Sequence, residues 1–85
     1  MPYAVVYTPR ARKELKSLSQ DLQERVFASL ERIRIRPRAF VKRLVGSPFY
    51  ALRVGDHRVI LDLKDGKLII LVITLGRREN IYRKL

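Results

Sequence analysis

Hydrophobic residues in the first half of the chain follow the period of an α-helix. A β-rich segment at residues 3–7 is followed by Thr8 and Pro9, residue types that favour a helix N-terminus. Ser19, followed by Asp21, favours the start of a second helix. Two apolar stripes at helical spacing support these starts, Ala11, Leu15 and Leu18 in the first helix and Leu22, Val26, Leu30 and Ile33 in the second. The pattern predicts a helical hairpin, with one helix over residues 9–18 and the other from residue 20 to before Pro37.

The second half of the chain has the period of β-strands. After a loop over residues 38–48, strands are predicted over residues 49–54, 57–63 and 67–75, with turns at Gly55 and Gly66. The last of these runs is apolar at almost every position, so we expect a central strand covered on both faces. Residues 81–85 form a short tail.

These elements predict a small α+β domain that spans residues 1–85 in the order β-α-α-β-β-β. We expect the N-terminal helical hairpin to pack on one face of a mainly antiparallel sheet. The first strand is expected at an edge of the three-stranded meander or beside its central strand.

Composition removes several classes of chemistry. The chain has 85 residues, no cysteine and a single histidine, His57, which excludes thiol catalysis, zinc ribbons and His-rich metal sites. We therefore expect no metal and no cofactor. No targeting segment is apparent, and the longest apolar run has eight residues, so we expect a soluble cytoplasmic protein with no membrane partner.

The positive charge is large for so short a chain. Nineteen basic residues, thirteen of them Arg, face eight acidic ones, which gives a net charge of +11. Such a balance favours a polyanionic partner, either a nucleic acid, an acidic protein segment or a membrane surface. The Arg bias favours phosphate recognition, because the guanidinium binds phosphate bidentately. A hot habitat also enriches charged residues, and the sequence does not separate these two explanations.

Between Glu31 and Asp56 the chain has no acidic residue and seven basic ones. They are Arg32, Arg34, Arg36, Arg38, Lys42, Arg43 and Arg53. We take Arg36, Arg38, Lys42 and Arg43, together with Arg77, as candidate phosphate-binding residues. The alternative interpretation is a solvated face.

Strand alternation gathers a candidate site. The apolar sets of the two hairpin strands should face the helices, which places Arg53 and Arg58 together on the open face of the sheet. Arg78 and Tyr82 follow the last strand and can converge on the same patch. The alternative is a set of solvated edge arginines. Asp62 is the expected counter-ion of Arg58, and His57 is expected on the opposite face.

Four motifs in order resemble the RelE/ParE toxin superfamily. The hairpin at residues 50–60 reads YALRVGDHRVI and is similar to that family's Y-x-L-R-V-G-D-Y-R-V-I pattern. The other motifs are YTPRARKEL at residues 7–15, LVG at 44–46 and LGRRENIY at 75–82. The resemblance covers essentially the whole chain.

The resemblance implies the toxin of a type II toxin–antitoxin pair. RelE-type members cut mRNA in the ribosomal A site without a metal, leaving a 2′,3′-cyclic phosphate and a 5′-hydroxyl. By resemblance the catalytic positions are Arg58, Arg78 and Tyr82, with Arg53 in support. The implied partners are an acidic RelB-like antitoxin, mRNA and rRNA in the ribosome, and operator DNA only through the antitoxin.

The sequence departs from the family pattern on the first hairpin strand. Some RelE enzymes carry two lysines there, and this chain has Ala51 and Arg53. A guanidinium stabilises charge but does not act as a base. Two alternatives therefore stay open, a ParE-like inhibitor of DNA gyrase with no enzymatic activity, and a basic nucleic-acid-binding module or inactive family member.

Overall fold

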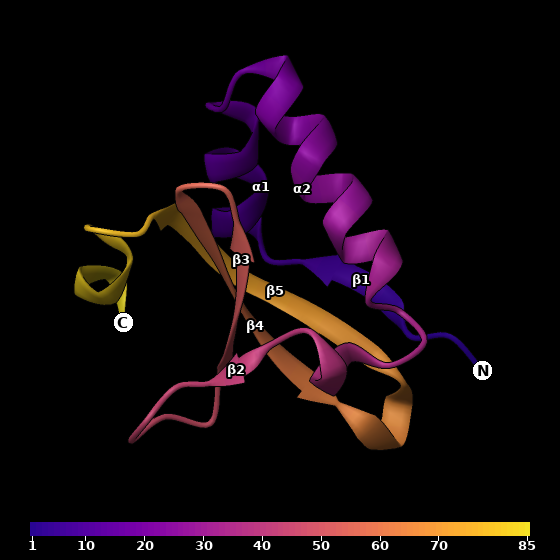
Figure 1. The fold of residues 1–85 in the computed structure, drawn as a ribbon. Helices are drawn as coiled ribbons and strands as arrows, with labels where there is room; N and C mark the ends of the chain where they lie inside the picture. Colours follow the sequence, from indigo (N-terminus) through magenta and orange to yellow (C-terminus); the bar gives the residue numbers. More distant parts are fainter.

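Two helices lie on one side of a five-stranded sheet (Figure 1). The computed structural model describes residues 1–85, except for the side chain of Lys84. The helices are α1, Pro9–Lys16, and α2, Gln20–Arg32. The strands are β1, Ala4–Tyr7, β2, Lys42–Arg43, β3, Tyr50–Val54, β4, His57–Lys64, and β5, Ile69–Arg77. Three short 3-10 helices complete the chain, namely η1, Pro37–Ala39, η2, Asp65–Lys67, and η3, Ile81–Lys84.

The sheet has the order β1-β5-β4-β3-β2, and only the β1–β5 pair is parallel. This confirms the α+β class, the helical hairpin on one face and the edge position of the first strand. The short strand β2 lies in the segment expected to be a loop. Its two residues pair with Ala51 and Tyr50 of β3, and a strand of only two residues has no periodicity in the sequence that would predict it.

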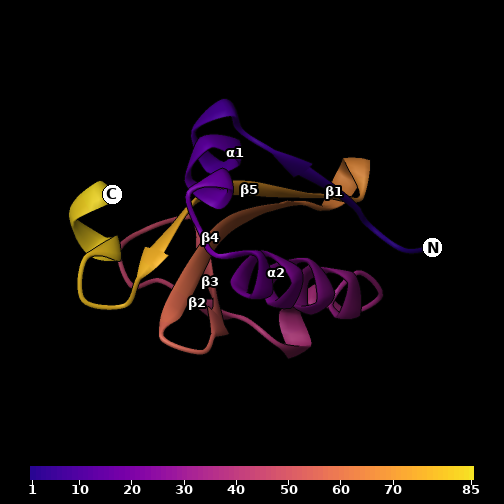
Figure 2. The same cartoon turned by 90° about the horizontal axis from the view of Figure 1, so that it is seen from above.

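Both helices have the predicted N-cap residues. The Thr8 hydroxyl accepts a hydrogen bond from the backbone N–H of Ala11 at 3.0 Å, and Ser19 accepts one from that of Leu22 at 3.2 Å. The first helix ends at Lys16 rather than Leu18, and the second at Arg32, five residues before Pro37. In Figure 2, α1 lies over β5 and α2 over β3, in agreement with their contacts.

The main core fills the space between the helices and the sheet. The stripe residues Val26, Leu30 and Ile33 are buried there against Val59 and Leu61 of β4. A smaller cluster on the open face joins Ala51 and Ile60 to Ile81 of η3. The C-terminal tail thus supplies part of the cover of the open face.

A β-bulge in β5 decides which of its residues enter the main core. Ile60 pairs with Thr74 but Leu61 pairs with Val72, so Ile73 is an extra residue. The Thr8 hydroxyl donates a hydrogen bond to the Ile73 carbonyl at 2.8 Å, which ties the bulge to the start of α1. The bulge lets Leu75 face the helices together with Val72, although strict alternation would place it on the other side.

The expectation that this strand lies inside the sheet is confirmed, but the expectation that both of its faces are covered is wrong. The middle strand of the five is β4, and β5 lies between β4 and the edge strand β1. Ile69, Leu71 and Ile73 of β5 are only partly buried, because α1 and α2 lie on the other face and η3 covers only part of the open one. Within the described part of the chain, neither helix is both long and apolar enough to cross a bilayer.

Candidate active site

A pocket of about 610 Å³ opens on the face of the sheet away from the helices. Its basic and polar lining consists of Lys42 and Arg43 of β2, Arg53 of β3, Arg58 of β4 and Tyr82 of η3. Phe40, Leu44, Val45 and Ala51 supply the apolar part. The pocket therefore brings together three of the four residues proposed as catalytic and two of those proposed to bind phosphate.

Arg58 is held in the pocket without a neutralising partner. Its Nη1 atom is inaccessible to solvent, and it has no hydrogen-bond partner among the described residues. Arg53 lies directly opposite Arg58 in the β3–β4 register, and like charges in that position repel. A buried cationic donor without an acceptor is costly, so this pair is arranged for an anion from outside.

The expected pairing of Asp62 with Arg58 is wrong. The carboxylate of Asp62 instead accepts from the Lys64 ammonium, with an Nζ–Oδ2 distance of 2.8 Å. Both residues belong to β4 and share a face two positions apart. Lys64 is two positions from Asp62 and Arg58 is four, so the ion pair forms with the nearer cation on the same face.

Arg78 lies in a neighbouring hollow rather than in the pocket itself. That hollow is lined by Asp56, Arg77, Arg78, Glu79 and Tyr82, so Tyr82 borders both spaces. The backbone N–H of Arg78 donates to the Asp56 carbonyl at 2.8 Å, which fixes the loop after β5 against the β3–β4 turn. Arg77, one of the candidate phosphate-binding residues, forms an ion pair with Glu79, with an Nε–Oε1 distance of 3.4 Å.

Ile81 anchors the tail that presents Tyr82. Ile81 is fully buried against Ala51 and Ile60, whereas Tyr82 is 56% exposed and Leu85 52% exposed. A 3-10 turn therefore holds the Tyr82 ring at the rim of the pocket while most of its surface stays open to solvent.

Arg38 is held away from the pocket by an exposed cluster. Its guanidinium donates to both carboxylate oxygens of Asp65 at 2.8 Å and lies 5.5 Å from the centre of the Tyr50 ring. The Tyr3 hydroxyl donates to the same carboxylate at 2.8 Å. The hydrogen bond from Arg38, and after it the one from Tyr3, lowers the pKa of Asp65 to about 2. This cluster ties η1 to η2 and holds the segment that leads into β2.

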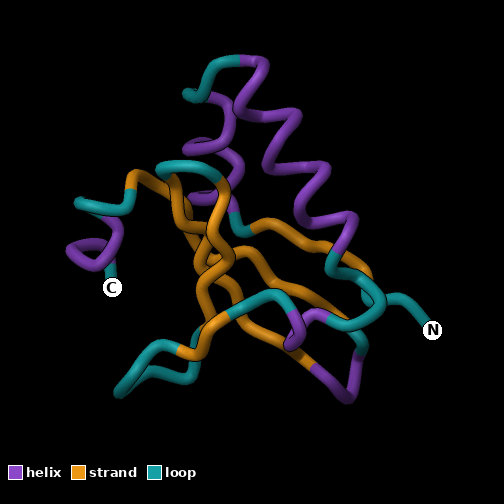
Figure 3. Tube along the Cα trace, viewed as in Figure 1, coloured by secondary structure: helices purple, strands orange, loops and turns teal.

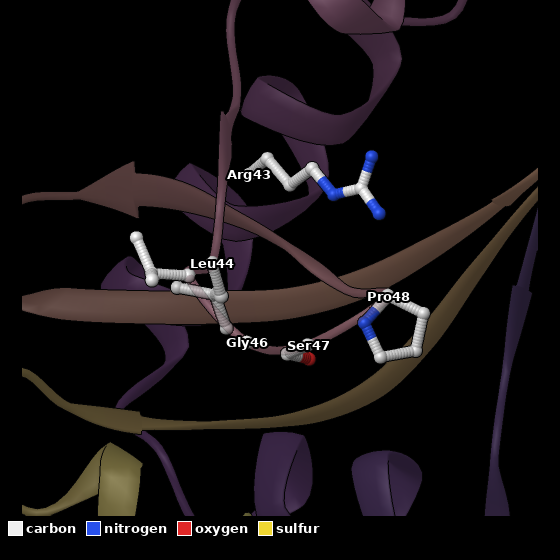
Figure 4. Close-up of a pocket in the computed structure, with 6 residues that line it drawn as sticks. Arg43, Leu44, Gly46, Ser47 and Pro48 are labelled. Atoms are coloured by element: carbon white, nitrogen blue, oxygen red, sulfur yellow. The ribbon is translucent and has the colours of Figure 1, made fainter.

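The remaining basic candidates divide between the pocket and solvent. Lys42 lies opposite Ala51 in the β2–β3 register and lines the pocket. It therefore supplies an ammonium next to the position where the resemblance expects a lysine. Arg36 is exposed and lines none of the described pockets. Arg43 borders both the pocket and a shallow hollow in the loop after β2 (Figure 4).

Phe40, Leu44 and Val45 are site residues that sequence reasoning missed. Phe40 is 49% exposed and Val45 is fully exposed, and both line the pocket. Figure 3 shows that the segments on both sides of β2 are largely loop. An aromatic residue within a basic, proline-flanked loop was the signal available, since such residues stack on bases in single-stranded nucleic acids.

The arrangement suits charge stabilisation on a phosphate. Three guanidiniums and an ammonium converge with a phenol at the rim, and guanidiniums form bidentate bonds to phosphate oxygens. Among the described residues, no three His, Cys, Asp or Glu side chains are grouped so as to hold a metal ion.

Known proteins resemble this chain over nearly its whole length. A family model described as the ParE toxin of the type II toxin–antitoxin system parDE matches residues 5–82. The mRNA interferase toxin RelE of Escherichia coli (strain K12) is 29% identical over 83 residues, which are 94% of this chain and 87% of that protein. Toxin RelG of Mycobacterium tuberculosis is 28% identical, with 99% and 100% covered.

Solved structures agree with this relationship. The intact E. coli RelBE toxin–antitoxin complex contains a chain with a TM-score of 0.76 and 28% identity, covering 88% of this chain and 95% of that one. A double mutant of E. coli RelE in the free state gives a TM-score of 0.80 at 28% identity, with both chains fully covered. From the family model, the relatives and the shared fold together, we conclude that the chain belongs to the RelE/ParE toxin superfamily of type II toxin–antitoxin systems.

Proposed function

We propose that this toxin is an endoribonuclease that cuts mRNA on the ribosome and so inhibits translation. The observation that carries the proposal is Arg58, a cation with a buried, unpartnered Nη1 atom in a pocket that also holds Arg53 and Tyr82. Homology to the RelE mRNA interferase supports the same activity.

The proposed reaction needs no group beyond the RNA and these side chains. The 2′-hydroxyl of one nucleotide attacks the adjacent phosphorus, and the bond from phosphorus to the 5′-oxygen breaks. The products are a 2′,3′-cyclic phosphate and a 5′-hydroxyl. In this scheme Arg58 and Arg53 stabilise the extra negative charge on the phosphorane-like transition state. Tyr82 donates the proton that the leaving 5′-oxygen requires.

Among the described residues, the pocket holds no strong general base to activate the 2′-hydroxyl. The described lining of the pocket has no carboxylate and no imidazole, and a guanidinium does not accept a proton. We assign the proton-accepting role to Lys42, the lining residue whose neutral amine form is a base. With such modest acid–base groups, positioning of the mRNA by the ribosome supplies much of the rate enhancement, and cleavage of free RNA is slow.

We further propose that an acidic RelB-like antitoxin controls the toxin. Structural neighbours of this chain include the RelB–RelE complexes of E. coli and Pyrococcus horikoshii. A net charge of +11 favours an acidic partner. Binding to operator DNA would then occur only through the antitoxin.

The family model favours one alternative, a ParE-like toxin that inhibits DNA gyrase. Two assays on the purified protein separate the activities. Cleavage of mRNA on programmed ribosomes, read as new 5′-hydroxyl ends, is expected for the wild type and expected to be lost in Arg58→Ala and Arg78→Ala. Inhibition of gyrase supercoiling without any ribosomal cleavage would overturn the proposal in favour of the ParE-like activity.

A further inference from the structure

A second basic groove lies on the helix side of β3, outside the candidate active site. It comprises two adjoining hollows, of about 160 and 280 Å³, which share Ser29, Arg32 and Arg53. We call it the α2–β3 groove and define it by Arg25, Ala28, Ser29 and Arg32 of α2 together with Arg53 and Gly55 of the hairpin.

The groove follows from the spacing of residues on α2. Positions 25, 28, 29 and 32 share one face of a helix, with two small residues between two arginines. Gly55 has a φ of +58°, and a Cβ atom added there would lie 3.2 Å from Nη2 of Arg25. The guanidinium of Arg25 therefore sits close over the hairpin turn, and Ala28 and Ser29 leave the space beside it open.

The charge of the groove is not neutralised from within the described part of the protein. Arg25, Arg32 and Arg53 are exposed, and none of them takes part in an ion pair or hydrogen bond of the described side chains. Glu31, in contrast, pairs with Arg34, at an Nη1–Oε1 distance of 3.0 Å. Three unpaired guanidiniums around one hollow form a site for an anion with several charges.

The groove and the candidate active site are continuous. Phe40 and Arg53 line both the active-site pocket and the smaller hollow of the groove. The outer edge of β3 is open at this point, since β2 pairs only with Tyr50 and Ala51. The long side chain of Arg53 thus bridges the two faces of the sheet around the end of β2.

We propose that the α2–β3 groove binds the sugar–phosphate backbone of the RNA strand that continues from the candidate active site. The inference rests on the proposed function for the identity of the strand. The groove favours a phosphate backbone over an acidic peptide, because its exposed lining is mainly arginine. Its apolar lining residues Ile33, Leu52 and Val54 are buried in the core, and Phe40 is exposed only where the groove meets the active-site pocket. A docked protein segment needs apolar anchors, whereas a nucleic-acid backbone needs bidentate donors at intervals.

The test is equilibrium binding of 2′-O-methyl oligoribonucleotides, which lack the attacking hydroxyl and are not cut. A short oligonucleotide fills only the active-site pocket, and one several times longer also reaches the groove. Variants Arg25→Gln and Arg32→Gln are compared with Arg12→Gln, an exposed arginine of α1 that lines none of the described pockets. All three remove one positive charge.

The groove variants are expected to weaken binding of the long oligonucleotide only. For single strands, each lost phosphate contact reduces the slope of log K against log salt by about 0.7. Arg25→Gln and Arg32→Gln should each show that change, whereas Arg12→Gln should leave the slope unaltered. Equal effects of all three variants, or equal effects on short and long oligonucleotides, would overturn the proposal that the groove binds RNA.

The same variants distinguish the groove from the other proposals. If Arg32→Gln weakens binding of the antitoxin and leaves RNA binding unchanged, the groove is a protein interface and the inference is wrong. If wild type fails to cut mRNA on the ribosome but the groove variants still change the salt slope, the proposed function fails and the groove stands.

Discussion

Arg58 affects both the stability of this protein and its proposed chemistry. A buried donor without a partner costs about 1–3 kcal/mol, and more when the group is charged. Arg53, which lies opposite Arg58 in the strand register, carries the same charge and repels it. The arrangement is unfavourable in the free protein, and under the proposed function a phosphate in the pocket would relieve that cost, as expected for a site preorganised for negative charge.

Replacing Arg58 by Met should therefore separate stability from activity. Met keeps an unbranched stem and removes the unpartnered Nη1 donor, so we expect the free energy of unfolding to stay level or to rise by about 1 kcal/mol. Ribosomal cleavage should be lost. Urea unfolding and the cleavage assay give the two readouts, and a strongly destabilised Met variant would show that Arg58 is a structural residue.

Tyr82→Phe tests the proton-donor role at the rim of the pocket. The variant keeps the ring and removes the hydroxyl, so single-turnover cleavage on the ribosome should fall by about 10²–10⁴-fold. If the ring only stacks on a base, Phe should serve nearly as well and Tyr82→Ala should cost about 1–3 kcal/mol in binding. A rate for Tyr82→Phe within a few-fold of wild type would eliminate the donor role.

At the scale of elements, the site depends on two small attachments on the open side of the sheet. One is η3, in which Ile81 is the fully buried anchor among the described side chains. The other is the segment around η1, which Arg38 joins to Asp65 in η2. Each attachment positions pocket residues that the regular sheet does not.

Ile81→Ala should release the tail without unfolding the domain. A buried Ile→Ala change typically costs about 2–5 kcal/mol, but a chain end can detach locally, so the global loss should fall below that range. Amide hydrogen exchange should show lost protection in residues 81–85, and cleavage should fall although Tyr82 is intact. Wild-type cleavage by a variant with a detached tail would contradict the placement of Tyr82 in the site.

The Arg38–Asp65 pair should make stability depend on pH in the acid range. The pKa of Asp65 falls from 3.8 to about 2, so the pair stabilises the fold fully above the unfolded value and loses that effect as pH falls towards 2. Both side chains are about half exposed, so the effect should be small. Chemical unfolding of wild type and Asp65→Asn should differ at pH 6 and converge as pH approaches 2. A difference that stays constant over that interval would show that the carboxylate charge contributes nothing.

At the scale of the whole molecule, the net charge of +11 sets how partners arrive. Long-range attraction raises association rates and is screened by salt, whereas short-range contacts govern dissociation. Raising salt should therefore slow association with an acidic antitoxin more than it speeds dissociation. Stopped-flow association rates that do not change with salt would argue against electrostatic steering.

The scale of an interaction also decides how much could be predicted from the sequence. The Thr8 and Ser19 caps and the alternation of Arg53 and Arg58 are local, and the structure agrees with them. The two-residue strand β2 is too short to show a period of its own, and the contact of Thr8 with the bulge at Ile73 and the ion pair of Arg38 with Asp65 join segments distant in sequence. For the same reason, the position of Arg78 beside the pocket rather than inside it could not be predicted from spacing.

The most direct test of the central claim is mapping of mRNA 5′ ends on programmed ribosomes, with purified wild-type protein and with Arg58→Met. We expect new 5′-hydroxyl ends, paired with 2′,3′-cyclic phosphates, at positions in the ribosomal A site with wild type and none with the variant. Intact mRNA after incubation with folded wild-type protein would contradict the claim that the pocket around Arg58 cuts RNA.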